Sequence, residues 1–219
     1  MVRSWVPAVL FGSLLLSATA RAELFEYGPA LCGDTVNFYC LEVGNTIIHQ
    51  EVKLKDGSTI TREKKTLETW ETLFPDETER EIVKRINRRN TPLYRKQKIA
   101  VPCDMAGKTY MDFSPFPLKI EPPGEKLLVW DPALLAYGAY DPEGNLVRWG
   151  PGAGGKDYCQ DVERGCRTVT GEFRIIKIGG PYYRSGKYPV DCVGKQCALM
   201  PYAMFFKSGY AFHAGRVPG

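Results

Sequence analysis

The hydrophobic pattern of the chain is mainly that of short strands, with one amphipathic helix. Ile82, Val83 and Ile86 recur at helical spacing and predict a helix capped by Asp76 or Thr78. Short apolar runs bounded by turn residues predict strands at residues 45–49, 52–54, 59–61, 98–101, 126–130, 134–140, 146–149, 168–175, 200–206 and 210–213. Between them we expect turns at Asp56-Gly57 and at Asp141-Pro-Glu-Gly-Asn145. The pattern therefore favours a mostly β protein with a small α+β module.

The first 22 residues have the pattern of a secretory signal peptide. A basic start at Arg3 is followed by the apolar run 6–16 and by the small-x-small sequence Ala20-Arg21-Ala22. We expect cleavage before Glu23. The apolar run is shorter than the roughly 20 residues that a membrane span needs, and no later segment is long and apolar enough. We therefore expect an exported protein that does not span a membrane after cleavage.

Export changes the interpretation of the seven cysteines, because an oxidising compartment permits disulfides. The spacing suggests three close pairs: Cys32 with Cys40, Cys159 with Cys166, and Cys192 with Cys197. An odd number leaves one thiol free or paired outside the chain. A metal site is the alternative, but the chain has only His49 and His213 and no CxxC sequence. We expect structural disulfides, no metal and no cofactor, and we expect His49 to be structural or on the surface.

Composition and charge exclude some classes of protein. Hydrophobic residues make up 44% of the 219 residues, which argues against a disordered chain. The net charge is +4, and the leader contributes two arginines and no acid, which is too weak a balance to indicate a nucleic-acid partner. Basic residues do gather near the predicted helix: Arg80, Lys84, Arg85, Arg88, Arg89, Arg95, Lys96 and Lys98. We expect a solvated helix face there, with weak attraction to an anionic polymer as the alternative.

Residues 60–103 have the predicted order strand, helix, helix, strand. Four short motifs lie in this stretch: Thr69-Trp70-x-x-Leu73, Ile86-Asn87, Pro92-Leu93 and Gln97-x-Ile99-x-Val101-Pro102. On these motifs the stretch resembles a LysM module, with Lys96 at the family's glycine position. The resemblance implies a groove for N-acetylglucosamine polymers, or a spacer that keeps the fold without the ligand. A Cys-containing segment, residues 23–59, precedes the module, and a Pro-rich linker, residues 104–124, follows it.

Residues 125–219 contain five motifs in a characteristic order: Tyr140-Asp-Pro-Glu-Gly-Asn-Leu-Val147, Gly150 to Lys156, Thr168-Val-Thr-Gly-Glu-Phe173, Met200-Pro-Tyr202 with Phe205-Phe206, and Phe212-His213-Ala214-Gly215. On these motifs the stretch resembles an L,D-transpeptidase catalytic domain of the YkuD type. The combination with a LysM-like module is similar to the enhanced-entry proteins of Gram-negative bacteria. The resemblance implies a YkuD-like antiparallel β fold, incomplete at its C-terminus, in a periplasmic protein of the cell wall.

The resemblance also implies a site. In the family a cysteine thiolate attacks a peptidoglycan stem tetrapeptide, D-alanine leaves, and the amine of a second stem resolves the acyl-enzyme. His213 matches the histidine that activates the thiol and carries the proton, and the carbonyl of Ala214 matches the group that orients its ring. Tyr202, Phe206 and Gly215 match substrate-binding positions. No cofactor is implied, and the partner is peptidoglycan.

The family's nucleophile lies in a later Ser-His-Gly-Cys motif, which these 219 residues do not contain. We favour a truncated piece of a working enzyme, through a frameshift, an early stop or an incomplete gene model, because an end just after an active-site strand leaves a sheet edge unpaired. We expect the chain to be L,D-transpeptidase-like but inactive. A non-catalytic secreted protein that binds the cell wall is the alternative, and a disulfide-stabilised protein that contacts host cells is a third possibility.

Overall fold

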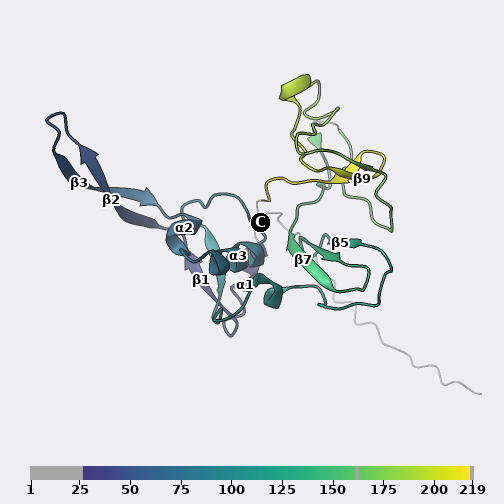
Figure 1. The fold of residues 1–219 in the computed structure, drawn as a ribbon, viewed down its shortest axis with the longest axis horizontal. Helices are drawn as coiled ribbons and strands as arrows, with labels where there is room; N and C mark the ends of the chain where they lie inside the picture. The colour runs from purple at the N-terminus through teal and green to yellow at the C-terminus, as the bar shows by residue number, and fades with distance from the viewer. Residues whose placement is uncertain (1–26, 161–162, 218–219) are drawn as a thin grey trace, which may run out of the picture.

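The computed structural model describes residues 27–160 and 163–217, so the expected signal peptide lies outside the described residues. Strands predominate and helices are few, as the sequence predicts. The strands of the described residues form four separate small antiparallel sheets (Figure 1). Within the described ranges, no helix is long and apolar enough to cross a membrane.

The N-terminal part consists of a two-stranded sheet and helices. Its elements are α1 (Tyr27–Leu31), β1 (Phe38–Glu42), α2 (Trp70–Leu73), α3 (Glu77–Ile86) and β4 (Lys98–Pro102). Strand β1 pairs antiparallel with β4, so the strand that closes the sheet comes from the Cys-containing segment. The core between this sheet and the helices contains Val43, Trp70, Phe74, Val83, Leu93, Ile99 and Val101.

Helix α3 follows the prediction closely. The carboxylate of Asp76 accepts a hydrogen bond from the backbone N–H of Glu79 at 2.9 Å, which selects Asp76 as the cap. Ile82, Val83 and Ile86 are all buried, as their spacing predicts. The apolar face of α3 thus fixes this helix against the N-terminal sheet.

A long hairpin is inserted between β1 and α2. Its strands β2 (Asn45–Lys53) and β3 (Thr59–Leu67) pair with each other along their whole length and project away from the body (Figure 1). The predicted turn at Gly57 is confirmed, since this residue has a positive φ of 87°. The predicted boundary between residues 59 and 60 falls inside this hairpin, and His49 is exposed on β2.

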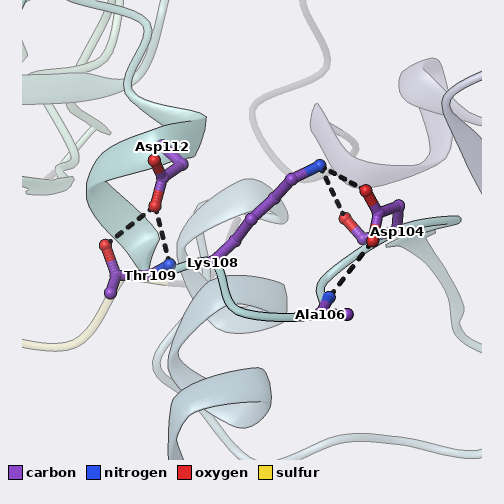
Figure 2. Close-up of polar contacts among 5 residues, drawn as sticks. All are labelled: Asp104, Ala106, Lys108, Thr109 and Asp112. Carbon is purple, nitrogen blue, oxygen red and sulfur yellow. Dashed lines mark hydrogen bonds and ion pairs between the residues drawn. The ribbon is translucent and has the colours of Figure 1, made fainter.

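Residues 104–124, predicted to be a linker, are a run of ordered turns. Asp104 pairs with Lys108, whose ammonium nitrogen lies 2.7 Å from the carboxylate (Figure 2). One turn further on, the carboxylate of Asp112 accepts the backbone N–H of Thr109 at 2.7 Å. These local bonds fix the path of the chain towards the next sheet.

The next sheet is a meander of β5 (Leu127–Asp131), β6 (Ala136–Tyr140) and β7 (Leu146–Pro151). The predicted turn between β6 and β7 is confirmed: the carboxylate of Asp141 accepts the backbone N–H of Asn145 at 2.8 Å. The core on this sheet contains Phe116, Ala136, Tyr140, Leu146 and Trp149, with the 3-10 helix η1 (Tyr110–Phe113) packed against it. The expected linker therefore contributes directly to a core.

The last sheet contains β8 (Lys177–Ile178), β9 (Met204–Lys207) and β10 (Tyr210–Phe212), with β9 in the centre. A 3-10 helix, η3 (Gly194–Gln196), lies between β8 and β9. The strand predicted at residues 168–175 is wrong. This segment is irregular: within the described chain its backbone joins no strand ladder, and Phe173 packs on Phe206 of β9.

The cysteine pairing agrees with the spacing. The structure holds the disulfides Cys32–Cys40, Cys159–Cys166 and Cys192–Cys197. Cys103 is free and exposed. Three disulfides fit an oxidising compartment outside the cytoplasm.

Candidate functional site

A cleft of about 820 Å³, called here the central cleft, lies between α3 and the C-terminal strands. Residues of α3 and the turn after it line one side, β5 and β7 contribute further residues, and β9, β10 and the following tail line the other side. The structure brings all five predicted site residues to this cleft: Tyr202, Phe206, His213, Ala214 and Gly215.

The imidazole of His213 is exposed at the cleft and is held by its own backbone. Its Nδ1 lies 3.0 Å from the carbonyl oxygen of Ala214. A carbonyl oxygen only accepts hydrogen bonds, so Nδ1 is the donor in this contact, and a neutral ring in this tautomer has its lone pair on Nε2. The backbone N–H of Ala214 in turn donates to the carbonyl of Pro201 at 3.1 Å. The ring is thus oriented as a proton acceptor through Nε2.

Aromatic side chains form the wall beside His213. The ring of Phe206 lies at their centre, with centroids of Phe173, Tyr210 and Phe212 between 5.3 and 6.2 Å away. These separations lie within the range of favourable aromatic pairs. Phe173 comes from the irregular segment 168–175, so its ring attaches that segment to β9 through side-chain packing.

Tyr202 has a strained backbone at the edge of the cleft. Its φ is 55°, in the left-handed region, which costs about 1 kcal/mol for a non-glycine residue. The residue is 61% exposed, so burial does not explain the conformation. Such strain is typical of functional sites, where it holds a side chain in a required place.

The glycine-rich loop after β7 closes over Trp130. A Cβ on Gly152 would collide with the indole ring, and one on Gly155 would collide with the carbonyl of Cys166. The hydroxyl of Thr168 accepts the N–H of Gly155 at 2.9 Å and ties the loop to the next segment. The indole N–H of Trp130 is buried without a hydrogen-bond partner among the described residues. The loop is therefore a packed cover, which explains its glycines.

The expectation of a solvated basic face on α3 is wrong for three of its residues. Arg85, Arg88 and Arg89 are buried. Arg88 donates to the carbonyl of Leu134 at 2.8 Å, and burial lowers the pKa of its guanidinium, an effect that Tyr27 opposes. Arg85 and Arg88 are buried where they donate to carbonyl groups and lie against aromatic rings at the joint with the β5–β7 sheet. Arg89 instead lies over the ring of Tyr94 and donates to the hydroxyl of Thr91 at 3.3 Å.

Arg85 connects α3 to the same sheet. Its guanidinium lies 3.9 Å from the ring centroid of Tyr110, donates to the carbonyl of Trp149 and pairs with Glu81 at 3.2 Å. The sequence could not show this, because an arginine on a helix is usually solvated. Other cations that line the cleft have no carboxylate partner among the described residues: Lys84, Arg89, Arg148 and Arg216. The cleft thus has aromatic side chains around Phe206 in its lining, and its lining carries more positive than negative charge.

The motifs that carried the LysM resemblance are mostly core positions. Trp70, Leu93, Ile99 and Val101 are buried, and the indole N–H of Trp70 donates to the carbonyl of Thr91 at 2.8 Å. These residues therefore explain the local packing and do not themselves form a groove.

None of the seven cysteines lines the central cleft, and the described residues contain no cluster of three metal-ligating side chains. Comparisons of the chain with protein-family models, with curated proteins and with solved structures found no match. A functional conclusion therefore has to come from the cleft. The sequence did not predict that α3 and the turn after it line the cleft. The basic cluster at residues 84–89 was the one feature that could have indicated it.

Proposed function

We propose that the protein is an exported, L,D-transpeptidase-like protein of peptidoglycan remodelling, whose central cleft binds stem tetrapeptides. The observation that carries the proposal is the Nδ1 contact of His213 with the carbonyl of Ala214, beside the aromatic wall around Phe206. This is the arrangement that the family resemblance implies for an oriented proton acceptor. A periplasmic location and a LysM-like origin of the helical part belong to the same proposal.

The charge of the cleft supports a peptide ligand of this class. A tetrapeptide ends in a carboxylate, and Arg148 and Arg216 line the cleft without an acidic partner among the described residues. Charge-assisted hydrogen bonds from arginine to a carboxylate are among the stronger polar contacts. The apolar part of the ligand would then pack on Phe206.

The chain should bind without turnover, because acyl transfer through a thiol needs a cysteine at the cleft. We would titrate the protein with a synthetic stem tetrapeptide by calorimetry and assay the mixture for free D-alanine. We expect binding and no release. Release of D-alanine that disappears in Cys192→Ala or Cys197→Ala would overturn the inactive assignment.

Two variants separate binding in the cleft from binding elsewhere. Phe206→Ala should weaken binding of the peptide about fivefold, because an aromatic contact contributes about 1 kcal/mol beyond its buried area. Tyr182→Ala is the matched control, since Tyr182 is 85% exposed and does not line the cleft. Equal loss in both variants would remove the cleft from the proposal.

Non-catalytic binding to the cell wall is the second candidate. The residues that carry the LysM resemblance are mostly buried, so they support a LysM-like fold and do not by themselves support glycan binding. A pull-down on purified sacculi distinguishes the two. Retention on sacculi without affinity for free tetrapeptide would support the wall-binding alternative. A protein that binds neither sacculi nor the free tetrapeptide would be a secreted protein with another partner.

A further inference from the structure

The segment after His213 is clamped by a residue of the helical part. Asn90 lies just after α3 and makes three hydrogen bonds to this tail. Its backbone N–H donates to the carbonyl of Val217 at 2.9 Å, and its Nδ2 donates to the carbonyl of Gly215 at 2.9 Å. Its Oδ1 accepts the N–H of Val217 at 2.7 Å. Asn90 thus pairs with the tail as a neighbouring strand would.

The clamped residue lies beside the histidine. A Cβ built on Gly215 would lie 3.7 Å from Cε1 and 3.8 Å from Nδ1 of His213, so the open side of this glycine faces the imidazole edge. The carbonyl that holds Nδ1 belongs to Ala214, between His213 and Gly215. On the other side, Ala214 is fixed by its N–H bond to Pro201. The position of that carbonyl therefore depends on an anchor at each end.

We propose that Asn90 is the positioning residue for His213. By fixing Gly215 and Val217, it keeps the carbonyl of Ala214 where it accepts the Nδ1 proton, and this sets the tautomer of the ring. The role of this tautomer in acyl transfer, in which Nε2 would accept the proton, rests on the proposed function. An asparagine suits the task because one amide supplies a donor and an acceptor together.

The experiment uses the histidine tautomer as its readout. The chain has two histidines, so ¹⁵N-histidine labelling gives two imidazole groups, and exposed His49 on β2 is an internal reference. The ¹⁵N chemical shifts are measured above the pH range in which imidazoles titrate. In the unmodified chain we expect the His213 proton on Nδ1. In Asn90→Ala we expect His213 to lose this dominant tautomer while His49 is unchanged.

Asn145→Ala is the matched control, because Asn145 lies in the β6–β7 turn and does not contact the tail. It should leave the His213 shifts unchanged. If Asn90→Ala does not fold, Asn90→Asp decides, since it keeps the acceptor for Val217 and loses only the donor to Gly215. An Nδ1 proton retained on His213 in the folded Asn90 variant, or absent from the unmodified chain, would overturn the inference. No peptide is added, so failure here is distinct from failure to bind stem peptides.

Discussion

The guanidinium of Arg88 lies 5.1 Å from the ring centroid of Trp149 and joins the end of α3 to the β5–β7 sheet. The same guanidinium lies 4.4 Å from the ring centroid of Tyr27 and donates to the carbonyls of Leu134 and Arg85. One side chain therefore serves three separate segments. We therefore expect Arg88 to contribute strongly to stability, although it forms no ion pair with a carboxylate among the described residues.

Arg88→Ala should lower the free energy of unfolding by about 3 kcal/mol, because the carbonyl of Leu134 loses this donor and the packing on Tyr27 and Trp149 is removed. Urea denaturation measures the change. Arg88→Lys keeps the charge and loses the planar fork, so a smaller loss is expected. A change within experimental error for Arg88→Ala would mean that the joint does not depend on this residue.

Stability should also fall in acid through Asp112. The backbone N–H of Thr109, and then its hydroxyl, hold the pKa of this carboxyl below its ordinary value of 3.8. A lowered pKa in the folded state adds stability that is complete above the unfolded value and is lost as the pH falls through the folded value. The urea midpoint should therefore drop below about pH 4.

Asp112→Asn supplies the control for this titration. The variant lacks the ionisable group, so its difference in stability from the unmodified chain should shrink as the pH falls below about 4. A difference that stays constant over the acid range would exclude Asp112 as a contributor.

Thiol counting checks the cysteine arrangement. Denatured, unreduced protein should react at one thiol per chain, and the native protein should react equally, because Cys103 is free and exposed. Cys103→Ser should abolish the reaction in both states. Five or more reactive thiols in the exported protein would reject the disulfide framework.

Gly152→Ala tests the loop over Trp130. The added Cβ would collide with the indole, so the loop must shift, and overpacking of this kind costs about 2 kcal/mol. Gly180→Ala is the matched control, because a Cβ there meets nothing within 4 Å. The two melting temperatures should differ clearly. If they agree, the loop is not packed as described.

The sequence predicted those features that depend on local spacing. The cap at Asp76, the buried face of α3, the turn at Asp141 and the three disulfides all follow from residues close together in the chain. The pairing of β1 with β4 was missed, because 55 residues (43–97), which include the hairpin and two helices, separate the strands and long-range pairing leaves no local signal.

Burial of polar residues was the other feature beyond sequence reasoning. Arg85 and Arg88 occupy positions where a solvated face is the ordinary expectation, and only the arrival of Tyr110 and Trp149 from later segments makes them interior residues. In the same way, the five predicted site residues come from the last 18 residues, whereas Asn90 could be connected to them only in space.

Helix α3 has a consequence for how the chain can be divided. Val83 faces the N-terminal core, while Arg85 is hydrogen-bonded to Trp149 of β7 and Arg88, just after the helix, to Leu134 between β5 and β6. A helix shared in this way makes the two halves inseparable, so they should melt in one cooperative transition. Neither half can be exchanged by itself. Replacing the part before residue 104 with an unrelated module would remove the α3 side of the cleft and also the contacts of Arg85 and Arg88 that support it.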